Sequence, residues 1–178
     1  QGSLLASRIL GNAFLSLGYD VKVSEVHGMS QRGGSVVTYV KYGEKVASPV
    51  ICRGEADFLI SFELLEAPRW LPYLKKGGVV VTSTQKIEPM PVIMGVKEYP
   101  EHIVEKIEAA GVKLMHADAL SLAEECGSSK ASNVVLIGMF AKHSDIPKDV
   151  CVKAVEECVP EKFRKLNLDA FEKGYALD

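Results

Sequence analysis

The stretch Asp57-Phe58-Leu59-Ile60-Ser61-Phe62 sets the fold class, because it is apolar without polar alternation. A strand with this pattern is buried on both faces, as parallel strands in α/β sheets are. The same pattern occurs again in Gly78-Val79-Val80-Val81-Thr82-Ser83. Between the two runs, residues 64–74 are predicted to form a helix. A strand, a helix and a second buried strand in this order predict a crossover between parallel strands.

The same alternation continues toward the C-terminus. Residues 102–110 predict an amphipathic helix, and Val112-Lys113-Leu114-Met115-His116 predicts a third strand. Four more helices are predicted, over residues 119–126, 130–142, 147–157 and 160–173. Helices that alternate with buried strands are expected to cover both faces of a sheet.

Toward the N-terminus the pattern changes to antiparallel signals. Apolar residues at helical spacing predict a first helix with Ser3 as its N-cap. Residues 19–26 alternate with period two and residues 35–42 are β-branched and aromatic, so both read as strands. Residues 46–51 are expected to complete a hairpin with the second of these strands. We therefore expect an α/β fold, three-layer α/β/α with a mixed, mainly parallel sheet.

Composition limits the classes of protein to which the chain can belong. The 178 residues are 47% hydrophobic and 25% charged, with a formal net charge of −2. This balance excludes a disordered chain, a nucleic-acid-binding arm and a polybasic membrane patch. No apolar run approaches the roughly 18 residues of a membrane helix. The length predicts one domain, residues 1–178, with a C-terminal helical extension over about 147–178.

The four cysteines, Cys52, Cys126, Cys151 and Cys158, are widely and irregularly spaced. No C-x-x-C pair is present, so a zinc or iron–sulfur site built from this chain alone is not expected. Free thiols at such spacing fit a reducing compartment, and we expect a cytoplasmic protein.

Two segments have the composition of ligand-binding loops. Gly2 and Ser3 lead directly into a helix, whose free N–H groups suit a phosphate or carboxylate; an ordinary capped helix start is the alternative. The second segment is residues 25–34, between the two N-terminal strands; it starts at Glu25 and includes Ser30. It then reaches Arg32-Gly33-Gly34, where glycines permit close approach and arginine can bind an anion. A hairpin-like loop with a surface arginine is the alternative.

Glu63 follows the predicted strand 57–62, at the end where α/β proteins form ligand sites. The alternative is a carboxylate that stabilises the start of the next helix. Thr82, Ser83 and Thr84 end the neighbouring strand and are expected at the same edge. No G-x-S-x-G elbow is present, so a hydrolase is poorly supported.

Four runs together carry a resemblance to a known family. They are S-E-V-H-G-M-S-Q-R-G-G-S-V, G-E-A-D-F-L-I-S-F-E-L-L-E-A-P-R, P-M-P-V-I-M-G and Y-P-E. The sequence resembles the gamma-type domain of 2-oxoacid:ferredoxin oxidoreductases, and within it the indolepyruvate branch, in which this domain is the beta subunit. The resemblance covers nearly the whole chain; its R-G-G loop and G-E-A-D strand entry are the specific parts.

The resemblance implies one subunit of an arylpyruvate (indolepyruvate):ferredoxin oxidoreductase, which converts 2-oxo acids to acyl-CoA and passes electrons to ferredoxin. It places thiamine diphosphate, magnesium and iron–sulfur clusters on a large partner subunit, and none in this chain. It implies that Arg32, Gly33 and Gly34 help form the coenzyme A side of the site or face the partner. It implies that the chain is inactive alone and that neither nucleic acid nor a membrane is among its partners.

The sequence departs from the family at its start. The family has a strand and a G-x-G-G-Q-G-type turn before the first helix, and Gln1-Gly2 corresponds to the end of that turn. We expect upstream residues to be absent from this sequence, which would leave neighbouring strands unpaired. The rival hypothesis is a stand-alone module that binds a small molecule or nucleotide. A subunit should expose a larger apolar patch than such a module.

Overall fold

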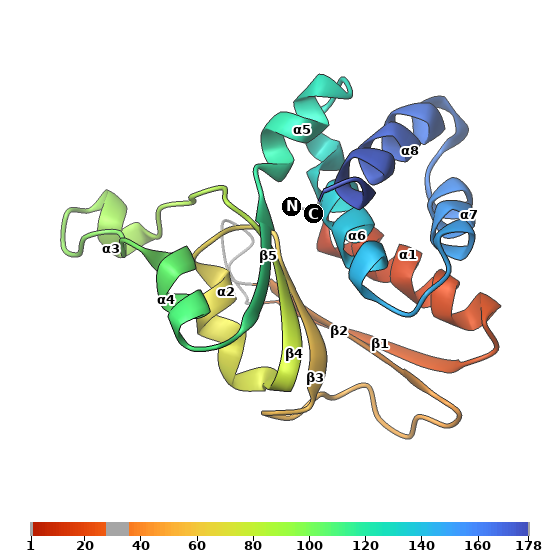
Figure 1. Ribbon diagram of the computed structural model, residues 1–178, viewed down its shortest axis with the longest axis horizontal. Helices are drawn as coiled ribbons and strands as arrows, with labels where there is room; N and C mark the ends of the chain where they lie inside the picture. Colours follow the sequence, from red (N-terminus) through yellow and green to blue (C-terminus); the bar gives the residue numbers. More distant parts are fainter. Residues whose placement is uncertain (1, 28–35, 178) are drawn as a thin grey trace.

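The computed structural model describes residues 2–27 and 36–177, which fold into helices packed around two small sheets (Figure 1). The helices are α1 Ser3–Ser16, α2 Glu66–Trp70, α3 Met90–Ile93, α4 Ile103–Ala109, α5 Ala119–Glu125, α6 Ser132–His143, α7 Lys148–Cys158 and α8 Glu161–Tyr175. The strands are β1 Asp20–His27, β2 Val36–Gly43, β3 Ala56–Ser61, β4 Leu74–Ser83 and β5 Lys113–Ala117. Short 3₁₀ turns occupy Leu71–Tyr73 and Ser129–Ala131.

The two apolar runs that predicted the fold are β3 and β4, which pair in parallel, and β4 pairs in parallel with β5. Alternate residues of β4 enter different cores. Val80 packs with α2 and α4, whereas Val79 and Val81 pack with α1 and α6. Figure 1 shows helices on both sides of this sheet. The predicted α/β class, with three layers and mainly parallel strands, is therefore confirmed.

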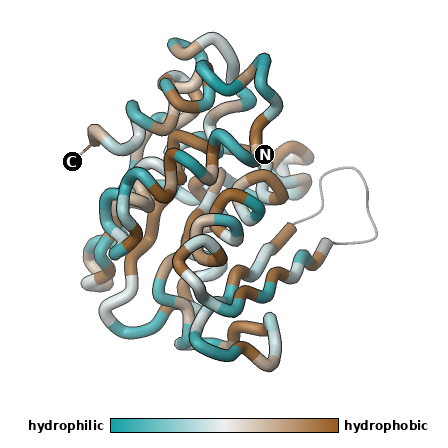
Figure 2. Tube along the Cα trace, turned by 90° about the vertical axis from the view of Figure 1, so that its right-hand side faces the viewer, coloured by the Kyte–Doolittle hydropathy of each residue, from teal (hydrophilic) through white to brown (hydrophobic). Residues whose placement is uncertain are grey.

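The antiparallel strands form a sheet of their own. β1 and β2 pair along their whole length, with Glu25 opposite Thr38. Among the described residues, this pair, here called the β1–β2 ribbon, does not pair with β3. Figure 2 shows hydrophobic and hydrophilic residues mixed along both strands. Val21 and Val23 of β1 lie next to Gly11 of α1, and Val40 of β2 packs against the same core. The strands are thus divided between two sheets, where we expected one mixed sheet.

Two local predictions are wrong for identifiable reasons. Residues 46–51 form no strand, because Val46 N donates to Asp20 Oδ2 at 2.8 Å and Pro49 has no N–H to donate. The helix expected over residues 64–74 is shortened to α2 because a 3₁₀ turn that contains Pro72 follows at Leu71–Tyr73, and β4 then starts at Leu74.

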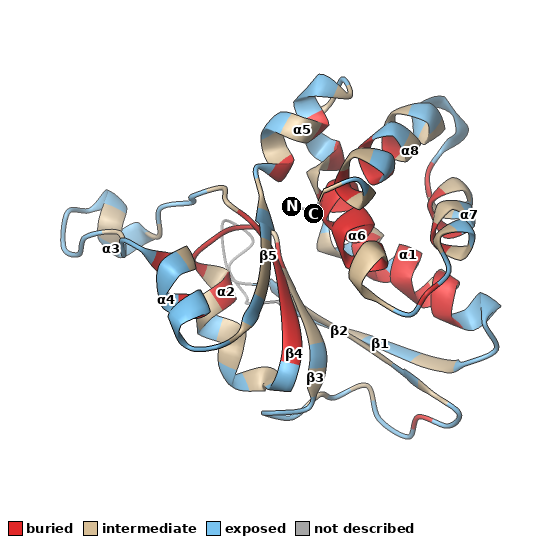
Figure 3. Ribbon diagram, in the orientation of Figure 1, coloured by how far each residue is buried: buried red, intermediate tan, exposed pale blue. Residues whose placement is uncertain are grey.

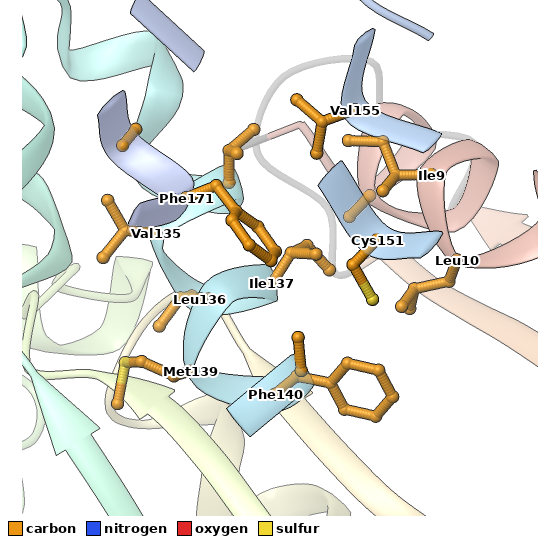
Figure 4. Packing of buried hydrophobic residues seen from close by; sticks show 14 of the residues in the cluster. Ile9, Leu10, Val135, Leu136, Ile137, Met139, Phe140, Cys151, Val155 and Phe171 are labelled. Carbon is orange, nitrogen blue, oxygen red and sulfur yellow. The ribbon is translucent and has the colours of Figure 1, made fainter. Parts of the chain in front are cut away.

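The main core is centred on α6, which is buried along nearly all its length (Figure 3). α8 crosses it at two facing glycines, Gly138 and Gly174, so that the helix backbones approach closely. Figure 4 shows Phe171 of α8 beside Ile137 of α6. This packing connects the C-terminal helices to the same core that supports the parallel sheet.

Candidate functional site

The N-terminal turn is fixed by a side chain from the centre of the fold. Gly2 is the N-cap of α1 and has a φ of 82°. The Nδ2 of buried Asn133, in α6, donates to the Gly2 carbonyl at 3.0 Å, and a Cβ at Gly2 would overlap that amide. Glycine is therefore required here both by conformation and by space. The predicted N-cap, Ser3, is instead the first helical residue and makes no cap hydrogen bond.

Ser3 turns toward the ribbon instead. Its hydroxyl donates to Glu25 Oε2 at 3.4 Å, and Thr38 Oγ1 donates to the same oxygen at 3.3 Å. The structure thus brings together three predicted site residues, Gly2, Ser3 and Glu25. Thr38 and Asn133 were missed; Thr38 lies opposite Glu25 in the β1–β2 pairing, whereas the expected hairpin joined its strand to residues 46–51.

The arrangement changes what the turn can bind. The Glu25 carboxylate lies at the N-terminal end of α1, where the helix dipole and the free N–H groups favour negative charge. A phosphate approaching this helix end would meet a carboxylate already held there by two hydroxyls. The turn is therefore better suited to anchoring the base of the following loop than to binding an anion by itself.

Glu63 lies apart from this group, after the carboxyl end of β3. It is only 5% exposed, and its Oε2 accepts a hydrogen bond from Leu65 N at 2.9 Å. Burial raises the pKa of the Glu63 carboxyl, while the bond from Leu65 opposes that rise. Its charged neighbours are Glu66 and Arg69 of α2, which pair with each other. Within the described residues no hydrogen bond joins Glu63 to Ser3 or Glu25.

The hydroxyls at the end of β4 serve local structure. Thr82 and Ser83 are both buried, Thr82 Oγ1 donates to the Ser83 carbonyl, and Ser83 Oγ accepts from Gln85 N at 3.2 Å. Leu64 N donates to the Gln85 carbonyl at 2.8 Å, which ties the segments that follow β3 and β4. Glu63 and the residues after β4 therefore form one connected edge.

The remaining predicted site residues, Ser30, Arg32, Gly33 and Gly34, lie outside the described residues. The described strands place the two ends of their loop: β1 ends at His27 and β2 begins at Val36. Because Glu25 and Thr38 flank these ends, the loop starts and finishes beside the N-terminus of α1.

A pocket of about 450 Å³ lies between β2 and β3. Its walls are the facing edges of these strands, residues 36–42 and 57–62, with Ser3 and Phe140 also contributing. β2 is paired on its other edge to β1, and β3 to β4. The charged lining residues are Lys41 and three carboxylates, Glu55, Asp57 and Glu66, so the lining disfavours a phosphate ligand. Strand edges and apolar side chains are instead the surroundings that suit an extended peptide.

The described residues contain no group of three histidine, cysteine, aspartate or glutamate side chains placed to hold a metal ion. All four cysteines are free, and burial raises the pKa of the Cys151 thiol to about 11. Among residues 2–27 and 36–177 no helix is long and apolar enough to cross a membrane.

Comparison with known families accounts for nearly the whole chain. Residues 1–177 match the family model described as pyruvate ferredoxin/flavodoxin oxidoreductase. The chain belongs to this family. It is 44% identical to indolepyruvate oxidoreductase subunit IorB of Thermococcus kodakarensis, over 98% of this chain and 89% of that protein. It is 36% identical to the subunit of the same name in Archaeoglobus fulgidus, with the same coverage.

More distant family members have other names. The common subunit gamma of the pyruvate/ketoisovalerate oxidoreductases of Thermococcus litoralis is 26% identical over 97% of this chain and 91% of that protein. Among solved structures, a keto/oxoacid ferredoxin oxidoreductase gamma subunit from Geobacter sulfurreducens superposes with a TM-score of 0.70. That match covers 98% of this chain and 89% of the other at 22% identity, so it establishes the shared fold.

Proposed function

We propose that this chain is a subunit of an indolepyruvate:ferredoxin oxidoreductase. The enzyme would decarboxylate an arylpyruvate, form the acyl-CoA and pass the electrons to ferredoxin. The observation that carries the proposal is the 44% identity to an indolepyruvate oxidoreductase subunit over 98% of the chain. The family resemblance of the R-G-G loop and the G-E-A-D strand entry supports the same branch.

The chemistry of the chain supports a division of labour between subunits. Thiamine diphosphate, magnesium and iron–sulfur clusters would reside on a large partner subunit, where they supply decarboxylation and electron transfer. This chain's sequence has no C-x-x-C pair, and its described residues offer no cluster of metal-ligating side chains. The chain would thus be inactive alone. Its widely spaced thiols support a cytoplasmic location.

Within the complex, we assign this chain's loop to coenzyme A or to the partner surface around it. Arg32 would bind a phosphate through its guanidinium, with Ser30, Gly33 and Gly34 allowing close approach. Gly2, Ser3 and Glu25 would hold the base of the loop, which their contacts with Thr38 and Asn133 support. Glu63 would face the partner at the edge formed after β3 and β4.

Co-expression with the large subunit tests the function. The purified pair should reduce ferredoxin with indolepyruvate and coenzyme A, and neither chain should do so alone. Arg32→Ala should raise the KM for coenzyme A about tenfold or more, because a charge-assisted phosphate contact is lost. Arg53→Ala, a change at an exposed arginine, is the matched control. A pair with no activity toward arylpyruvates would refute the function, and an unchanged KM would refute the role of Arg32.

A further inference from the structure

A short segment beyond β4 projects from the body of the molecule. Residues 87–96, here called the α3 knob, carry five large apolar side chains that are 41–69% exposed: Ile87, Met90, Ile93, Met94 and Val96. Figure 1 shows α3 set apart from the other elements, and Figure 3 shows this region mostly exposed. These side chains present apolar surface on the order of 500 Å², the upper range for the largest patch on a monomer.

The α3 knob holds its own shape. Met94 N donates to Met90 O at 2.9 Å, and the N–H groups of Val96 and Lys97 both donate to Pro91 O, at 2.9 and 3.0 Å. Gly95, with a φ of 70°, reverses the chain. Because these bonds are local, the apolar side chains are displayed by a preformed turn, which lowers the entropy lost on binding.

The base of the α3 knob is tied to the domain. Lys86 Nζ lies 5.8 Å from the centre of the Tyr99 ring, so the residues that enter and leave the segment meet. Tyr99 packs against the core cluster beneath α2 and α4. Gln85, just before the segment, accepts the bond from Leu64 N, which follows directly on Glu63. The knob therefore continues the edge of the sheet that carries Glu63.

The charges beside the α3 knob indicate which type of partner the knob can bind. Lys86, Glu88, Lys97 and Glu98 cancel, so the surface offers no net charge for steering. Electron-transfer partners associate through small interfaces, and fast encounter relies on complementary charge. A permanent subunit contact is larger and more apolar, with roughly 1,000 Å² or more from each partner. The knob has the chemistry of the centre of such a contact.

We propose that the α3 knob is the docking surface for the large subunit of the same oxidoreductase and inserts into an apolar recess of that subunit. The proposal rests on the proposed function, because it takes the partner from there. The five exposed apolar side chains of the knob would become buried in the complex, surrounded by a rim of charged residues whose net charge is zero. The contact would place the Glu63 edge against the partner.

Charge introduced into the α3 knob tests the proposal. The large subunit is purified, and its affinity for Ile93→Glu, Met94→Glu and wild-type chains is measured by sedimentation velocity. Both variants should bind about tenfold more weakly or worse, as expected for side chains at the centre of an interface. Phe163→Glu, a change at an exposed aromatic residue of α8, is the control and should bind within about twofold of wild type.

The outcomes separate the two proposals. If wild type binds the large subunit and both knob variants bind equally well, the docking surface is wrong while the function stands. If wild type fails to bind, both are wrong. If the variants lose only self-association of the isolated chain, the knob is a contact between copies and the proposal is overturned. Melting temperatures of the isolated variants show that they fold, and Val96→Ser serves as a milder change.

Discussion

Two of the closest helix contacts in this protein are possible only because a glycine has no Cβ atom. A Cβ at Gly138 would overlap the Phe171 carbonyl oxygen, and one at Gly174 would overlap the Val135 carbonyl oxygen. Both contacts are with backbone, which cannot rotate away as a side chain can. These glycines allow α6 and α8 to cross at short distance, in the same way that Gly2 allows Asn133 to reach the N-terminal turn.

Gly138→Ala should therefore destabilise the protein by about 3 kcal/mol, the upper range for overpacking, because α8 must move away from α6. The midpoint of urea denaturation measures the loss. Gly11→Ala is the matched control: its Cβ would meet only the side chains of Val21 and Val23, at ordinary distances. That change should be neutral or stabilise by up to ~1 kcal/mol. Equal midpoints for both variants would contradict the close crossing.

The buried carboxyl of Glu63 should make stability depend on pH. Its folded pKa is raised by burial, so folding favours the neutral form. The stability that comes from this is complete below the ordinary pKa of 4.5 and is lost as pH rises through the higher folded value. Glu63→Gln, which keeps an acceptor for Leu65 N, should melt at a higher temperature than wild type at pH 7.

At pH 4 the same two proteins should melt at similar temperatures, because the wild-type carboxyl is then largely neutral. Glu108→Gln, at an exposed position of α4, controls for the change in net charge and should show no such pH dependence. If Glu63→Gln lowers the melting temperature at pH 7, the ionised carboxylate has a stabilising partner, and the interpretation that burial destabilises the ionised form is wrong.

At the scale of elements, the short helix α5 depends on its N-cap. α5 has only seven residues and begins at Asp118, whose side chain accepts from Ser121 N at 3.0 Å and from Ser121 Oγ at 2.7 Å. These bonds lower the pKa of the Asp118 carboxyl. So short a helix depends on its cap and on burial of Ala119 and Ala123 in the main core.

Asp118→Ala should cost about 1 kcal/mol of stability near neutral pH. Because the folded pKa is depressed, the contribution of the ionised carboxylate is present above the ordinary value of 3.8 and is lost as pH falls through the folded value. The difference between wild type and Asp118→Ala, followed by thermal melts, should shrink accordingly. Asp118→Asn retains a capping acceptor and should stay close to wild type at pH 7; a full loss there would contradict capping.

At the scale of the whole molecule, a central core holds several separate surfaces in place. The parallel sheet and α6 form the centre, the β1–β2 ribbon rests on α1, and the α3 knob projects beyond the body (Figure 1). The Glu63 edge and the knob are continuous, while the ends of the loop at His27 and Val36 lie near the start of α1. Each surface would be completed by a partner under the proposed function.

We expect the isolated chain to bind no thiamine diphosphate and to oxidise no 2-oxo acid. Its sequence has no C-x-x-C pair for a cluster and no diphosphate–metal motif of the G-D-G…N type. Isothermal titration with thiamine diphosphate and magnesium should give no heat of binding, and the same titration of the assembled pair is the positive control. Micromolar binding to the isolated chain would overturn the division of labour.

Local patterns were sufficient for much of this fold. The apolar runs of β3 and β4 and the helical periodicity after them predicted the parallel sheet and its two helical layers, because burial on both faces leaves a continuous apolar signal. Period-two alternation likewise predicted β1, and β-branched and aromatic residues predicted β2. The position of Glu63 after the carboxyl end of β3 followed from the strand prediction, and the family resemblance came from short motifs that are local as well.

Other features depend on residues far apart in the chain. The contact of Asn133 with Gly2, the shared hydrogen bonds of Ser3 and Thr38 to Glu25, and the crossing at Gly138 have no signature within one segment. The division of the strands into two sheets also has no signature within one segment. The sequence of a strand determines which of its faces is buried, but it does not determine which strands lie beside it. The pattern of buried and exposed residues is encoded within each segment, so it can be predicted from the sequence. Which segments contact each other closely depends on how the whole core packs, so only the tertiary structure decides it.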